Sequence, residues 1–207
     1  MVGARTETLP RGPFALPDPS RDRLAELLRR AVRDARRHGE TVAAVSWRLD
    51  ATVDPSAVVL ASRRSGEPWM CFEQPDRERS VVAALGAAVA LEDRGHQRFE
   101  RTAERWRDLV ARAHVDTQPG PPGSGLVACG GFAFAGDGGG THAWSGFAPA
   151  SLVLGEVTLA RWGVDVWCTL AVAAGPDDSA DVLLEGIETR LGELSDRPLP
   201  LLDPHPT

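Results

Sequence analysis

The segment 125–173 constrains the fold more than any other part of this chain, because its apolar runs are short and glycines separate them. Short apolar runs bounded by glycine are typical of consecutive, mostly buried β-strands. We therefore expect four strands, over residues 126–135, 151–154, 157–161 and 164–173. The glycines at 136–140 are expected to form a turn between the first two of them.

Three segments instead have apolar residues at helical spacing. In the first, Ser20 has the properties of an N-cap, leucines and alanines recur every three or four residues, and His38-Gly39 is a stop signal. In the second, from Gly95 to His114, the apolar stripe runs through Phe99 and Trp106, and Trp106 is expected in the core. A last helix is expected to begin at residue 178 or 179 and to continue to about residue 194.

The region between the first two helices predicts further strands. Residues 41–49 are expected to form one, and residues 57–62 and 68–73 are expected to form a hairpin around Ser65-Gly66. Residues 80–91 fit either a helix or a strand, because they are rich in alanine but also contain several valines and the interior Gly86. The valines and Gly86 favour a strand.

Helices that alternate with groups of closely connected strands predict an α+β fold, a mainly antiparallel sheet with packed helices. The chain has 207 residues, which is enough for a buried core. We expect one domain over residues 20–195, an irregular proline-rich arm over 1–19 and a proline-rich tail over 196–207.

The composition excludes several classes of function. The formal net charge of −6 is opposite to that of a nucleic-acid-binding surface. All 23 basic side chains are arginine, so this chain offers no lysine for a Schiff base, a general base or a phosphate loop. No membrane-spanning apolar run and no signal peptide are evident, and the three cysteines form no metal-type pair. We expect a reduced, cytoplasmic protein.

The glycine-rich segment 136–146 and its His142 are the most suggestive candidates for a site. The segment lacks the lysine of a phosphate loop, and no helical pattern follows it. No second ligand at a metal-binding spacing accompanies His142, so a surface-loop residue is the expected interpretation. A nucleophile elbow, Gly-x-Ser-x-Gly, does not occur. We therefore assign no catalytic, cofactor-binding or metal-binding residue to this chain.

A family resemblance rests on the order of several segments. They are Ser46-Trp47, residues 68–77 (PWMCFEQPDR), residues 84–88 (ALGAA), Gly95 with Arg98 and Phe99, residues 129–135 (CGGFAFA), and Trp144 with Phe147. Together they resemble the N-terminal half of isochorismate synthases, which belong to the chorismate-utilising enzymes. The resemblance implies half of the α/β sandwich of that family. Ala135 and Gly155 depart from the family pattern, in which Asp and Pro are frequent at these positions.

The resemblance also implies that catalysis requires a second half. In the family, a lysine in a KVVLAR-like strand of the C-terminal half is the general base, and glutamates there act as the acid and hold Mg²⁺. The segment AVVLASR at 57–63 has Ala57 in place of that lysine and lies in the wrong half. With no lysine anywhere, the family mechanism cannot operate on this chain alone.

The resemblance therefore predicts the N-terminal portion of an isochorismate synthase, a scaffold in an enzyme that converts chorismate to isochorismate for menaquinone or siderophore synthesis. The expected partner is a C-terminal chorismate-binding half, fused or separate, which would bring chorismate and Mg²⁺. One alternative is a non-catalytic binding or regulatory module of the same fold. Another is the N-terminal part of a salicylate, aminodeoxychorismate or anthranilate synthase. A scaffold half is expected to expose a large apolar surface.

Overall fold

A computed structural model describes residues 12–116, 120–138, 142 and 146–198. Its elements, in chain order, are α1 (Asp18–His38), β1 (Thr41–Leu49), α2 (Pro55–Ser62), β2 (Trp69–Gln74), β3 (Ser80–Leu85), β4 (Val89–Asp93), α3 (Arg98–Arg112), β5 (His114–Val115), β6 (Ala128–Phe132), β7 (Ala150–Leu154), β8 (Val157–Trp162), β9 (Asp165–Ala174) and α4 (Ala180–Gly192). Among the described residues, no helix is both long and apolar enough to span a lipid bilayer.

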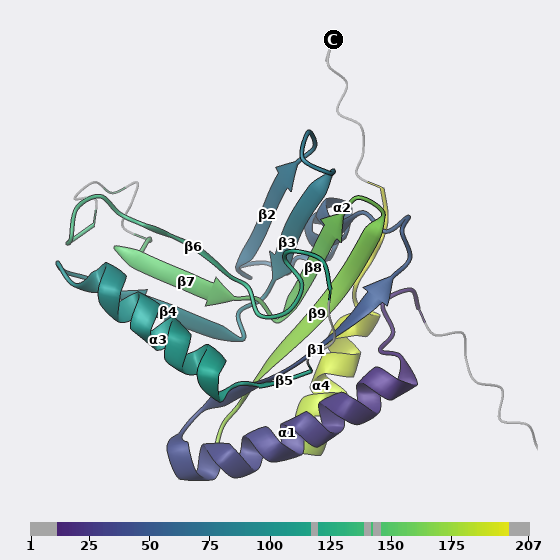
Figure 1. Cartoon of the computed structure of the whole chain (residues 1–207), viewed down its shortest axis with the longest axis horizontal. Helices are drawn as coiled ribbons and strands as arrows, with labels where there is room; N and C mark the ends of the chain where they lie inside the picture. The colour runs from purple at the N-terminus through teal and green to yellow at the C-terminus, as the bar shows by residue number, and fades with distance from the viewer. Residues whose placement is uncertain (1–11, 117–119, 139–141, 143–145, 199–207) are drawn as a thin grey trace, which may run out of the picture.

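The strands form two sheets (Figure 1). The larger has six strands in the order β2-β3-β8-β9-β1-β5, and only the pairing of β1 with β5 is parallel. The smaller has the antiparallel order β4-β7-β6. Helices α1, α2 and α4 contribute side chains to one core with the large sheet, while α3 packs against the small sheet. The predicted α+β fold with mainly antiparallel sheet and packed helices is confirmed.

Helix α1 lies along the large sheet and buries the apolar stripe that its sequence predicts, including Leu24, Leu28 and Val32. It begins at Asp18, so the predicted N-cap at Ser20 is wrong. Pro17 occupies the cap position, and the buried Ser20 lies inside the first turn. The prolines at the start are compatible with a helical first turn because its N–H groups have no intrahelical acceptor.

The predicted hairpin strand at 57–62 is also wrong, because Pro55–Ser62 forms helix α2. The Asp54 carboxylate accepts the backbone N–H groups of Ser56 and Ala57, which caps the helix, and Pro55 occupies its first turn. This capping signal outweighs the strand preference of the valines. The segment that resembles the catalytic strand is therefore a helix against β3, with Ala57 buried in it.

The ambiguous segment 80–91 forms two strands rather than one. Strand β3 pairs with β8 in the large sheet, and β4 continues beside β7 in the small sheet. Between these pairings, the three residues 86–88 lie opposite only two residues, 155–156. The additional residue forms a β-bulge. Gly86 has φ of 71°, a left-handed conformation that favours glycine. The bulge bends one two-stranded ribbon from the first sheet into the second.

A second apolar cluster fills the corner between the sheets. Its buried members are Val42, Ala44, Leu154 and Ala171. Trp106 of α3 is half-buried and packs against them, so the core role predicted for it is confirmed in part. Phe99, the other aromatic residue of the predicted stripe, is 49% exposed, and Val110 one turn after Trp106 is 40% exposed.

Candidate functional site

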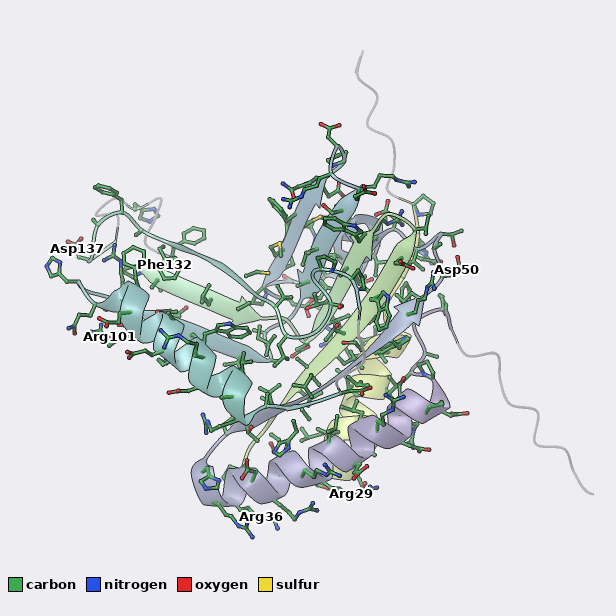
Figure 2. The ribbon with its side chains drawn as sticks, in the orientation of Figure 1. Arg29, Arg36, Asp50, Arg101, Phe132 and Asp137 are labelled. Carbon is green, nitrogen blue, oxygen red and sulfur yellow. The ribbon has the colours of Figure 1, made fainter. Side chains whose placement is uncertain are left out.

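The strongest candidate site is an exposed group of aromatic rings at one end of the small sheet. We call Phe99, Phe132 and Phe134 the aromatic surface. The rings of Phe99 and Phe132 stack with centroids 4.8 Å apart, and Phe134 two residues further on is fully exposed. Figure 2 shows Phe132 at the same end of the molecule as Arg101 of α3. Large apolar side chains gathered in solvent indicate an interaction surface.

Arg98 stabilises the backbone around the aromatic surface through hydrogen bonds. Its side chain is buried, and its guanidinium donates to the carbonyls of Gly95, Ala133 and Phe134. Ala133 donates its own N–H to the carbonyl of Pro149, the residue before β7, but Pro149 has no N–H to return. Arg98 therefore satisfies the carbonyl of Ala133, just beyond β6, which the β7 side cannot. Two segments of the family resemblance, 95–99 and 129–135, meet at this contact.

Two adjacent glycines in β6 have different environments. A Cβ atom on Gly130 would lie 1.8 Å from the backbone oxygen of Ser151, so only glycine fits there. A Cβ atom on Gly131 would meet nothing within 4 Å. Gly130 is thus required for the close approach of β6 to β7, while Gly131 faces open space.

An ion pair and several hydrogen bonds join α3 to β4, the edge strand of the small sheet opposite β6. The Arg101 guanidinium donates to both oxygens of Asp93, at 2.8 and 2.5 Å, and the backbone N–H of Arg94 donates to the same carboxylate. These bonds, those from Arg101 foremost, lower the pKa of Asp93 from 3.8 to about 2. Arg105 adds a bond to the backbone carbonyl of Glu92. The helix that supports the aromatic surface is therefore anchored to β4 at several points.

This anchor predicts a pH dependence of stability. Because the pKa of Asp93 is lower in the folded chain than its ordinary value of 3.8, the contribution of this carboxylate is fully present above about pH 4 and is lost as the pH falls to about 2. Urea unfolding of the wild type and Asp93→Asn should therefore differ at pH 6, and the difference should disappear near pH 2. A constant difference across this range would contradict the assigned role of the ion pair.

Neither a metal-binding cluster nor an activated thiol is present among the described residues. No group of three or more His, Cys, Asp or Glu side chains there could hold a metal ion, so the Mg²⁺ implied by the resemblance has no ligand set among them. His142 is exposed, in agreement with the expected surface position. Burial raises the pKa of Cys71, Cys129 and Cys168, which disfavours the thiolate. The glycines at 139–140 of the predicted turn lie outside the described residues.

Sequence reasoning anticipated an exposed apolar surface but did not locate it. Residues 126–135 are predicted to form one mostly buried strand, whereas β6 is an edge strand over Ala128–Phe132 whose Phe132 is 41% exposed. The glycine pair in CGGF is the signal that could have indicated an edge, since glycine leaves one side of a strand without side-chain cover.

Comparison with known proteins identifies the family. A family model described as "Chorismate binding enzyme" matches residues 26–205, and this chain belongs to that family. Over 120 residues the chain is 38% identical to the salicylate biosynthesis isochorismate synthase of Pseudomonas aeruginosa, and the match covers 58% of this chain. It covers only 23% of the relative, so the chain matches about a quarter of that protein's length.

A solved structure is similar to this chain. It is the menaquinone-specific isochorismate synthase MenF from Escherichia coli, with 16% sequence identity and a TM-score of 0.49. The superposition covers 86% of this chain and 36% of that one.

Proposed function

We propose that this chain is the N-terminal portion of an isochorismate synthase and serves as a scaffold for a catalytic half that binds chorismate. In the assembled enzyme, chorismate is converted to isochorismate, and the residues that carry out the reaction belong to the partner half. Family membership over residues 26–205 supports the substrate class. The relative from Pseudomonas aeruginosa supports isochorismate as the product.

The aromatic surface is the observation that carries the scaffold role. Phe134 has no cover from the described chain, and the stacked pair of Phe99 and Phe132 continues the apolar area beside it. Aromatic side chains dominate the energetics of protein interfaces when they become buried there. A docked half would remove this surface from water, which also explains why the apolar stripe of α3 extends beyond the core of this chain.

The chemistry of the chain supports the same division of labour. The family resemblance requires a lysine as general base, and the sequence of 207 residues contains none. The segment most similar to the lysine-bearing strand forms α2, where Ala57 is 5% exposed and packed in the core. A lysine at this position would start from a buried site in a helix rather than from an open strand. The scaffold role requires a partner that brings the base, the acid and the metal ligands.

Reconstitution tests the proposal directly. We would purify the part of the Pseudomonas aeruginosa relative that lies outside the matched segment, mix it with this chain, chorismate and Mg²⁺, and follow isochorismate by chromatography. The remainder alone should be inactive, and addition of this chain should restore isochorismate formation. Absence of both a complex and product, while the intact relative is active under the same conditions, would refute the scaffold role.

A matched pair of variants locates the contact. Phe134→Asp places a charge on the aromatic surface and should weaken the complex by about tenfold or more, since hot-spot aromatics dominate interface energies. Val182→Asp is the control, because Val182 of α4 is 65% exposed but lies on a helix that packs on the large sheet. Both side chains are well exposed, so neither change should unfold the chain. Equal effects of the two variants on binding, measured by calorimetry, would exclude the aromatic surface as the contact.

A further inference from the structure

The two edge strands of the small sheet, β4 and β6, differ in how they are protected from pairing with another strand. On one side, β4 carries the charged residues Glu92 and Asp93, and Arg105 of α3 occupies the backbone carbonyl of Glu92. Charge and side-chain cover are common means by which proteins block an exposed sheet edge. On the other side, β6 pairs with β7 alone among the described strands. Its sequence, ACGGF, contains no charge and no proline. This edge therefore lacks the usual protection.

The register shows which backbone groups of β6 are free to pair. Ala133 donates its N–H to Pro149 at 2.8 Å, so the bonds to β7 fall on this residue and on alternate residues before it. Cys129 and Gly131 belong to this bonded set. The backbone N–H and C=O groups of Ala128, Gly130 and Phe132 must then point away from β7, toward the open edge.

The open edge of the large sheet offers a contrast. Strand β2 is also an edge strand, but it contains Glu73, and the Arg63 guanidinium lies 5.2 Å from the ring centroid of Trp69. A charge within the strand and an arginine over its aromatic ring both oppose edge-to-edge pairing. The β5 edge of the same sheet is only two residues long. Of the described edges, β6 is the one best suited to accept another strand.

We propose that the partner half docks by adding an extended strand to the open edge of β6. This inference rests on the proposed scaffold function and specifies its binding mode. The identity of the added strand is inferred from the coverage of the relative. The match covers only 23% of that protein, so most of such an enzyme consists of other segments, and one of these would pair with β6. Backbone pairing gives affinity in strand addition, and side-chain pockets beside the strand give specificity. The aromatic surface at the end of β6 supplies such a neighbouring contact.

Residue-resolved hydrogen exchange tests this geometry. With the remainder of the Pseudomonas aeruginosa relative as the probe, exchange at Ala128, Gly130 and Phe132 should slow by about tenfold or more on complex formation. Cys129 and Gly131 already donate to β7, so their exchange should change much less. The alternation along one strand distinguishes strand addition from general burial, which would slow all of these amides together.

Two lysine substitutions provide the matched variants. Gly131→Lys adds a charged side chain to the face of the edge strand β6, at a position where a Cβ atom meets nothing within 4 Å. Ala90→Lys adds the same side chain at an exposed position of β4, the protected edge of the same sheet. Gly131→Lys should weaken the complex by about tenfold or more, while Ala90→Lys should leave affinity within about twofold.

The outcomes separate the binding mode from the function. Formation of an active complex without slower exchange at Ala128, Gly130 and Phe132 would overturn strand addition and leave the scaffold function standing. Absence of any complex would overturn both. Slower exchange at these amides in the isolated chain at high concentration, with a matching rise in mass, would show that a second copy occupies the edge, and this would overturn the assigned occupant.

Discussion

Glu67→Leu is expected to reduce the free energy of unfolding by about 3 kcal/mol, because it leaves a buried arginine without its main partner. The Arg190 guanidinium of α4 lies 2.5 Å from the Glu67 carboxylate, and both side chains are almost fully buried, at 4% and 9% exposure. Arg190 also donates to the carbonyl of Ser62 at the end of α2. The pair therefore joins α4, α2 and the turn before β2. Urea unfolding at pH 7 measures the loss.

Two further variants give this prediction its controls. Arg64→Ala removes an exposed ion pair with Glu193, and exposed pairs contribute about 0–1 kcal/mol, so little should change. The double variant Glu67→Leu, Arg190→Met removes both buried charges and should regain most of the stability lost by Glu67→Leu alone. A double variant no more stable than Glu67→Leu would show that packing, rather than the unpaired charge, causes the loss.

Gly130→Ala should destabilise the chain by about 1–3 kcal/mol, the cost typical of overpacking. The new methyl would lie 1.8 Å from the backbone oxygen of Ser151, and backbone atoms cannot move aside as a flexible side chain can. Gly131→Ala is the matched control, since its Cβ atom meets nothing within 4 Å and it should be neutral or slightly stabilising. Thermal unfolding of the three proteins checks the difference. Equal stabilities would mean that β6 and β7 can separate without cost.

Local sequence signals were sufficient for most of the elements but not for how they assemble. The strands at 151–154, 157–161 and 164–173 were predicted to within a residue or two, because glycines mark their ends. Helix α2 was missed because three consecutive apolar residues, Val58, Val59 and Leu60, favour a strand when the capping Asp54 is overlooked. The sequence itself carries the cap signal, as the pair Asp54-Pro55.

The division into two sheets could not be predicted from local patterns. Gly86 is a local signal of a break within residues 80–91, since an isolated glycine in a strand often marks a bulge, but it does not show that β3 and β4 belong to different sheets. What separates them is the partner strand, which supplies two residues opposite three at the bend. Such a mismatch can be recognised only when the pairing of the strands is known. The exposure of Phe99 and Phe132 depends on the same bend, because a periodic apolar pattern is the same whether its face meets the core or solvent.

The bulge at residues 86–88 also bears on how this shape could arise and change. A ribbon with equal numbers of residues on its two strands would run straight from β3 into β4 and from β8 into β7. One inserted amino acid, opposite residues 155–156, is thus enough to turn a single broad sheet into two blades set at an angle. The direction of the small sheet, which carries the aromatic surface, is therefore set by the number of residues in this short connection. Deletion of Ala87 would change the angle between the two sheets, and with it the orientation of any partner bound to the aromatic surface.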